Sequence, residues 1–101
     1  MVLVYFLFDF PAQQMGENLV KTSQALAQSI TQEPGFIRKY WIEDAKSEKA
    51  GGVYLFADRT SAEAYVVKHT ARAKQWGATQ VESHLFDVNA PLSKITLCEM
   101  P

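Results

Sequence analysis

The chain of 101 residues is 48% hydrophobic and 21% charged, has a formal net charge of −1, and contains one cysteine. This length predicts a single domain, residues 1–101, with room for one hydrophobic core. The nearly balanced charge disfavours a nucleic-acid-binding protein, and a single cysteine excludes an internal disulfide framework.

The first segment, Val2–Phe10, is an almost unbroken apolar run of strand length. Because both alternating sides of the run are apolar, we expect a strand that is covered on both faces. The run has no basic residues before it, contains Asp9, and lacks a cleavage site of small residues, which disfavours a secretory signal. No stretch reaches the length of a membrane span, so we expect a soluble, cytoplasmic protein.

The segment Met15–Ile30 has apolar residues at helical spacing. This pattern predicts one amphipathic helix that packs its apolar stripe on a sheet. The helix is expected to end before Pro34, because proline cannot continue a helix. Pro34 and Gly35 together predict a turn, since proline fixes its own φ and glycine tolerates a positive φ.

A pair of strands is predicted at the centre of the chain. Phe36–Glu43 and Val53–Ala57 are rich in aromatic and β-branched residues, which favour strands. The charged segment Asp44–Ala50 is typical of a solvated loop, and Gly51-Gly52 permits a tight backbone after it. Two strands joined by a short polar loop predict an antiparallel hairpin.

A second helix is predicted from Ser61 to Trp76. Thr60 and Glu63 have the spacing of a capping box at its start, and Gly77 follows as its C-terminal stop. Helical periodicity turns one set of its side chains towards the sheet. These are Ala62, Tyr65, Val66, His69, Ala73 and Trp76.

The last part of the chain predicts a strand and a short tail. Thr79–Val88 alternates in the manner of a fourth strand. After a turn, Leu92–Lys94 is predicted as a single helical turn and Ile95–Met100 as a short fifth strand.

The order of these elements, β-α-β-β-α-β, predicts an α+β fold of the ferredoxin-like kind. Right-handed crossovers give a four-stranded antiparallel sheet with both helices on one face. Two helices cover only one face of a sheet, although the first two strands are apolar on both faces. We therefore expect a homodimer through the helix-free sheet face, in which the two sheets close into a barrel and the C-terminal tail reaches the partner.

Four blocks of the sequence, in order and spacing, carry a family resemblance. The chain resembles the small bacterial YdhR-type monooxygenases along nearly its whole length. The blocks are Gln32–Phe36, Ala50–Phe56, Lys68–Arg72 and Phe86–Ser93.

The resemblance implies a dimeric α+β barrel, similar in fold to the antibiotic-biosynthesis monooxygenases, with a pocket between helices and sheet in each subunit. It also implies oxygenation of an aromatic or polycyclic compound without metal, flavin or haem. It brings no catalytic residue with it, because fold transfers between relatives more readily than chemistry does.

Two residues of the second helix are the candidate catalytic residues. His69 lies in the middle of the apolar stripe and is either a hydrogen-bonded core histidine or a pocket residue that transfers a proton or donates a hydrogen bond. Arg72, one turn later at the edge of the stripe, either stabilises an anionic substrate or intermediate or pairs with an acid at the surface.

Four large aromatic residues are candidates for substrate binding, because they lie on elements that enclose the space between helices and sheet. Each of them taken alone is better explained as an ordinary core residue, whereas the set beside His69 favours an aromatic-lined pocket. They are Trp41, Tyr54, Tyr65 and Trp76.

These residues suit a cofactor-independent monooxygenase, in which a deprotonated phenol or enol itself supplies the electrons to oxygen. Neither a metal-ligand spacing nor a dinucleotide-binding loop is found in the sequence. The alternatives are a non-redox isomerase or lyase that uses the same base, a non-catalytic binder of a small hydrophobic ligand, and a haem-degrading protein with His69 as axial ligand.

Overall fold

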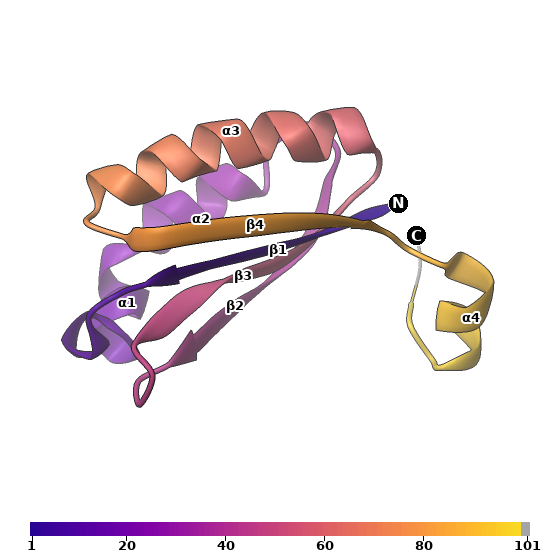
Figure 1. Ribbon diagram of the computed structural model, residues 1–101. Helices are drawn as coiled ribbons and strands as arrows, with labels where there is room; N and C mark the ends of the chain where they lie inside the picture. Colours follow the sequence, from indigo (N-terminus) through magenta and orange to yellow (C-terminus); the bar gives the residue numbers. More distant parts are fainter. Residues whose placement is uncertain (100–101) are drawn as a thin grey trace.

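The structure, a computed structural model, describes residues 1–99. Its elements follow the expected order through the fourth strand, with one short helix added after the first strand (Figure 1). The strands are β1 (Val2–Asp9), β2 (Phe36–Asp44), β3 (Lys49–Phe56) and β4 (Thr79–Asp87). The helices are η1 (Ala12–Gln14), α1 (Glu17–Thr22), α2 (Gln24–Ile30), α3 (Arg59–Gln75) and α4 (Ala90–Ile95).

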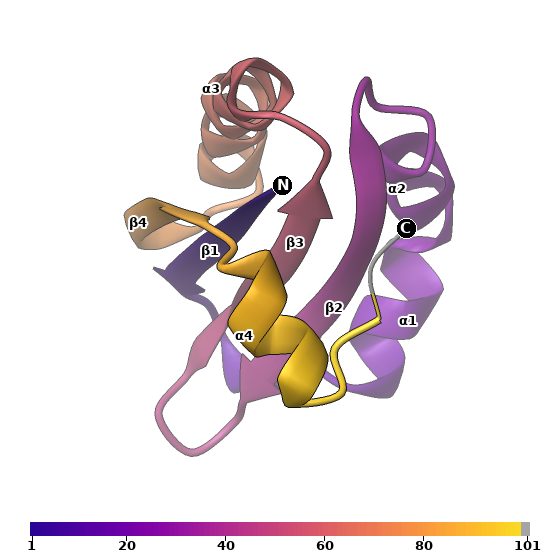
Figure 2. The ribbon, with the colours of Figure 1, turned by 90° about the vertical axis from the view of Figure 1, so that its right-hand side faces the viewer.

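The four strands form one antiparallel sheet in the order β2-β3-β1-β4. Helices α1, α2 and α3 cover one face, and α4 extends beyond the end of the sheet (Figures 1 and 2). The prediction of a ferredoxin-like α+β fold is therefore confirmed.

The hydrophobic core lies between this sheet and its helices. Every second residue of β1 is buried there, while the residues between them are only half-buried on the other face. The largest fully buried side chains are Val4, Phe6, Ile30, Tyr54, Phe56 and Tyr65. The strand pattern thus assigns one sheet face to the core and leaves the other face without a helix.

The prediction of one continuous helix over Met15–Ile30 is wrong, because the helix is interrupted at Ser23, where φ is −113° and ψ is 10°. A continuous helix would pair the Val20 carbonyl with the backbone amide of Gln24. Here the side-chain Nε2 of Gln24 donates to that carbonyl at 2.8 Å instead. A side-chain hydrogen bond therefore replaces the backbone bond at the break.

The hairpin differs from the prediction in the length of its second strand. Strand β3 begins at Lys49 and includes both Gly51 and Gly52, which were expected to precede it. Lys49 is held in the sheet opposite Asp9, with which it forms an ion pair. In β2, the register shifts between Phe36 and Arg38, so these two residues point to opposite faces despite their spacing of two.

The start of α3 is capped by Asp58, and the predicted capping box of Thr60 and Glu63 is wrong. The Asp58 carboxylate accepts hydrogen bonds from the Ser61 backbone amide at 2.8 Å and from the Ser61 hydroxyl at 3.1 Å. The helix therefore begins at Arg59. Its predicted stop is correct, since Gly77 follows with a φ of +91°.

Asp58→Ala is expected to lower the free energy of unfolding by about 1 kcal/mol, because the first turn of α3 loses its side-chain acceptor. Urea denaturation followed by circular dichroism measures this change. Thr60→Ala is the matched control and is expected to stay within about 0.5 kcal/mol of the unmodified protein. Equal decreases in the free energy of unfolding for the two variants would contradict the assignment of the cap to Asp58.

In the C-terminal tail, the predicted helical turn at Leu92–Lys94 is confirmed and belongs to the longer helix α4. The N-cap of α4 is Asn89, whose side-chain oxygen accepts from the Leu92 amide at 3.2 Å. The predicted fifth strand is wrong over its described residues, 95–99, and Met100, the last residue of the predicted strand, lies outside the described residues. Within residues 1–99, every helix is too short or too polar to cross a membrane.

Candidate active site

A cavity of about 320 Å³ lies between the sheet and its helices, on the helix-covered face. Helices α1 and α2, with the residue between them, contribute Leu19, Thr22, Ser23 and Leu26 to its wall, and α3 contributes His69. Strand β1 and the residue after it contribute Phe8 and Phe10, while Lys39 and Trp41 come from β2 and Trp76 follows α3. The cavity is therefore mainly apolar and aromatic, with few polar groups.

His69 is the buried polar residue of this wall, with 3% of its surface exposed. Its ring stacks on that of Tyr65 at 5.0 Å and lies 4.9 Å from Phe6 and 5.8 Å from Trp76, between ring centroids. These aromatic rings fix the orientation of the imidazole.

Arg72 determines which nitrogen of His69 is protonated. Its Nη2 lies 3.0 Å from His69 Nδ1, and since a guanidinium only donates, Nδ1 must be the acceptor. Burial, helped by the charges of Lys39 and Arg72, lowers the pKa of His69 to about 3. His69 is therefore neutral near neutral pH and carries its proton on Nε2, which makes no hydrogen bond within the described chain.

Arg72 itself lies behind His69 and does not line the cavity. Its guanidinium is 5.9 Å from the centroid of the Tyr65 ring. Its Nε is buried without a hydrogen-bond partner among residues 1–99. The guanidinium of Arg72 thus contacts the imidazole and not a ligand, and its positive charge is felt in the cavity because the surroundings have low polarity and screen it weakly.

The four predicted aromatic residues fall into two pairs. Trp41 and Trp76 line the cavity and are 39% and 43% exposed, so they stand where it reaches the surface. Tyr54 and Tyr65 are buried behind the wall, with their hydroxyl oxygens 3.2 Å apart. Burial raises the pKa of both hydroxyls, which keeps them protonated.

Lys39 belongs to the site but is not among the residues that the sequence pattern suggested. Its Nζ lies 3.4 Å from the centroid of the Trp41 ring and 4.7 Å from that of Tyr54. Burial, with a smaller contribution from the positive charge of Arg72, lowers its pKa from 10.5 to about 7. Lys39 lies two residues before Trp41 on the same strand, so both side chains lie on the same face of the sheet; this spacing could have identified Lys39 from the sequence.

The family model described as "Putative mono-oxygenase ydhR" matches residues 4–99. The chain belongs to this family. The predicted family is thereby confirmed, and with it the coarse assignment to a monooxygenase-type family. No curated protein matches the sequence of the chain.

A solved structure supports the fold of this YdhR-family chain. It is the 1.40 Å crystal structure of a "putative antibiotic biosynthesis monooxygenase" from Deinococcus radiodurans, with a TM-score of 0.65 and 15% sequence identity. The match covers 88% of this chain and 93% of the other. At this level of identity the likeness shows a shared fold and not a shared reaction.

The charged side chains in and directly behind the cavity wall of this YdhR-family protein are all positive. Among residues 1–99, no aspartate or glutamate lines it, while Lys39 lies in its wall and Arg72 lies behind His69. Within the described part of the chain, no three His, Cys, Asp or Glu side chains gather as metal ligands would. The arrangement suits a planar aromatic molecule that carries or acquires a negative charge.

Proposed function

We propose that the protein is a cofactor-independent monooxygenase that oxygenates an aromatic or polycyclic small molecule in this cavity. The observation that carries the proposal is the position of His69 in an aromatic wall, with its Nδ1 at 3.0 Å from the Arg72 guanidinium, which leaves a protonated Nε2 for a ligand. Membership of the YdhR family supports the reaction class.

In the proposed reaction, an electron-rich phenol or enol binds between Trp41 and Trp76 and reacts as its anion with molecular oxygen. Counted from the keto tautomer of an enol, a ring CH₂ group becomes a carbonyl: it gains one oxygen atom, and its two hydrogens leave with the other oxygen atom as water. The substrate is thus the reductant. His69 Nε2–H donates to the substrate oxyanion, and Arg72 stabilises its charge.

The two buried tyrosines have a supporting role in this proposal. Tyr65 stacks on His69, and Tyr54 holds the Tyr65 hydroxyl. Together they keep the imidazole in one orientation, which matters because a donor misplaced by about 1 Å loses much of its effect. The apolar wall excludes water, which strengthens the hydrogen bond to the anion.

His69→Ala is expected to lower the rate of oxygen consumption by about 10²-fold or more, because a preorganised donor to the oxyanion is lost. Oxygen uptake is measured with a panel of hydroquinones, anthrones and related phenols, with and without a chelator. We expect chelator-insensitive uptake with at least one substrate.

Glu63→Ala is the matched control, because Glu63 lies exposed on α3 and contributes neither to the cavity nor to the helix-free face. It is expected to keep normal turnover. Full activity of His69→Ala, with a normal thermal unfolding curve, would remove His69 from the mechanism.

The same experiment separates the alternatives. Conversion of a substrate without oxygen uptake would identify an isomerase or lyase. A ligand that raises the melting temperature and is recovered unchanged would identify a binding protein, and a shifted Soret band on addition of haem would point to His69 as a haem ligand.

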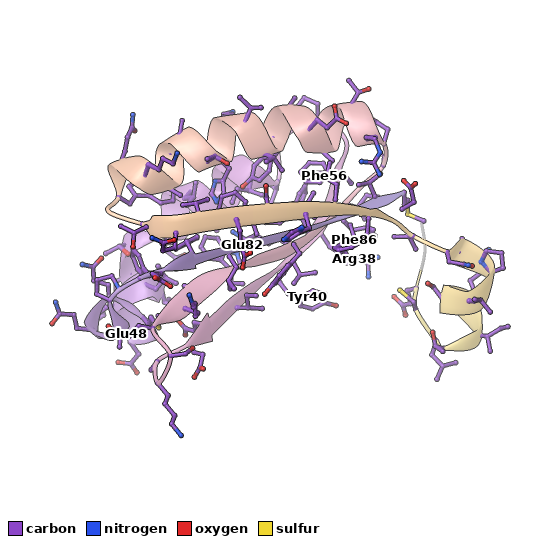
Figure 3. All side chains as sticks on the ribbon, in the orientation of Figure 1. Arg38, Tyr40, Glu48, Phe56, Glu82 and Phe86 are labelled. Atoms are coloured by element: carbon purple, nitrogen blue, oxygen red, sulfur yellow. The ribbon has the colours of Figure 1, made fainter. Side chains whose placement is uncertain are left out.

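We also propose that the protein forms a homodimer through the helix-free face of the sheet. Apolar residues from all four strands lie on this face, where Tyr40 is 64% and Phe86 is 54% exposed (Figure 3). The strand register places Leu3, Tyr5, Leu7, Tyr40, Val53, Leu55 and Phe86 together on it. An apolar surface of this extent needs a cover, and the same face of a second copy is self-complementary under a two-fold axis.

Sedimentation analysis is expected to give the mass of a dimer, and Phe86→Asp is expected to shift the protein towards monomer, because a charge would be buried between the sheets. Glu63→Ala on the exposed side of α3 is the control and should leave the mass unchanged. A monomer mass that does not vary with protein concentration would contradict the dimer.

A further inference from the structure

The amine of Lys39 is a basic group inside the cavity that the proposed reaction has not used. The side chain starts from β2 on the helix-covered face, beside Trp41, and its Nζ lies against the faces of two aromatic rings. Ring faces attract a cation weakly and do not lock it as a carboxylate does. The amine is therefore held in place, and it remains available to a ligand in the cavity.

Gly52 provides the space in which the Lys39 side chain lies. A Cβ built on Gly52 would come within 2.6 Å of Lys39 Cε and 2.8 Å of Tyr54 Cε1. Any larger residue on this position of β3 would displace the amine or the ring. The backbone of β3 thus accommodates the lysine stem beside the cavity.

Unlike Lys49 and Lys68, Lys39 has no carboxylate partner within the described residues. Lys49 is paired with Asp9, and Lys68 with Glu33 at 2.8 Å. For Lys39 the charged and titratable neighbours are Arg72 and His69 of α3, with the tyrosine hydroxyls of Tyr54 and Tyr65 behind them.

Within the described chain, the wall formed by α1, α2 and the residue between them adds no charge, because it consists of Leu19, Thr22, Ser23 and Leu26. A pKa of about 7 means that Lys39 exists both as amine and as ammonium near neutral pH. A group in this state can take a proton from a ligand and then remain beside the resulting anion.

His69 is poorly suited to this task. Its Nδ1 lone pair is used by Arg72, and its Nε2 already carries a proton. We propose that Lys39 Nζ accepts the proton of an aromatic or enolic hydroxyl bound in the cavity, and then holds the oxyanion as an ammonium ion together with the Nε2–H of His69. The O–H bond breaks, an N–H bond forms, and no electron is transferred.

This inference rests on the proposed function for its substrate class, an ionisable aromatic hydroxyl. It is tested without oxygen, with 2-naphthol as the probe, because the naphtholate absorbs at longer wavelength than the neutral form. At about pH 8, where free 2-naphthol is protonated, we expect the unmodified protein to bind it as naphtholate. The proton stays on Lys39, so no net proton release should be detected by titration calorimetry in buffers of different ionisation enthalpy.

Two variants of Lys39 distinguish a residue that accepts a proton from one that only supplies a permanent positive charge. Lys39→Arg keeps the positive charge but has no neutral form, so it is expected to bind naphtholate and to release the proton to the buffer. Lys39→Met is expected to bind the neutral naphthol, with no red-shifted absorbance. Lys68→Met, on the exposed side of α3, should behave as the unmodified protein does.

Any of four results would overturn the proposal, of which three concern bound 2-naphthol. These three are neutral 2-naphthol bound to the unmodified protein, naphtholate bound to Lys39→Met, and proton release from the unmodified protein equal to that of Lys39→Arg. Failure of 2-naphthol to bind at all would overturn it as well, because the cavity is required to accept an aromatic hydroxyl.

Turnover gives a second, independent readout. With a substrate found by oxygen uptake, kcat/KM is expected to rise with pH through about pH 7 and to fall by about 10²-fold or more in Lys39→Met. Naphthol ionisation without oxygen uptake would refute the monooxygenase and leave Lys39 as proton acceptor. Oxygen uptake by Lys39→Met with an unchanged pH profile would support the monooxygenase and refute Lys39 as its proton acceptor.

Discussion

Gly51→Ala is expected to destabilise the fold by about 3 kcal/mol or more, because the added methyl group meets the backbone of the neighbouring strand. An ideal Cβ on Gly51 would lie 1.9 Å from the carbonyl oxygen of Phe6 and 2.8 Å from its carbon. Phe6 is fully buried in the central strand β1. A backbone atom cannot rotate away as a side chain can, so one of the two strands would have to move.

Gly16→Ala is the matched control for this effect. Gly16 has a φ of +62°, but within residues 1–99 no atom beyond its chain neighbours lies within 4 Å of an added Cβ. Its replacement is expected to cost about 1 kcal/mol, from backbone strain alone. Urea denaturation of the two variants compares steric clash with strain directly. If Gly51→Ala lowers the free energy of unfolding no more than Gly16→Ala does, β1 and β3 can move apart at little cost.

The fold was predictable because its signals are repeated along the chain. Val2–Asp9 has strand length and is followed by helical periodicity, and the same alternation recurs after Phe56. Once the hairpin is placed between the two helices, right-handed crossovers leave one topology. The order β2-β3-β1-β4 follows from that rule without knowledge of any side-chain contact.

The predictions that were wrong share a cause: they depend on contacts between particular residues, which hydrophobic periodicity does not reveal. The break at Ser23 depends on a side-chain bond from Gln24 to the Val20 carbonyl. The extension of β3 through Gly51 depends on the close approach of β1. Glycine pairs are commonly taken to signal turns, but they also occur where two backbones must come close together.

The candidate site was predictable in part for a similar reason. His69 is found from helical spacing, because a polar residue in an apolar stripe is conspicuous. Lys39 is not found in this way, because a charged residue in a half-exposed strand is ordinary and the bulge after Phe36 conceals which face it occupies. Strand parity with Trp41, together with Gly52 on the facing strand, would have placed it in the cavity.

Lys39→Met is expected to stabilise the protein, most strongly below pH 7. In the folded state the pKa of Lys39 is about 7, whereas it is 10.5 without the fold. Between these values the unfolded chain binds more protons than the folded one, so stability rises with pH through this window. Below pH 7 the full cost of burying the charge is present, and above 10.5 it is absent.

The difference between the two pH limits corresponds to about 3 kcal/mol, after a reduction for water that reaches the open cavity. Urea denaturation at several pH values is expected to show that the advantage of Lys39→Met shrinks as the pH rises. Lys49→Met is the control, because the ion pair with Asp9 raises the pKa of Lys49 and its loss brings no such gain.

A pH-independent effect of Lys39→Met would mean that the lysine is solvated in the folded protein and that its amine is an ordinary surface base. A pH-dependent gain in stability, combined with loss of naphthol ionisation, would show that the fold tolerates an unfavourable residue in the cavity. Such a cost is expected where a group serves a reaction and not the core.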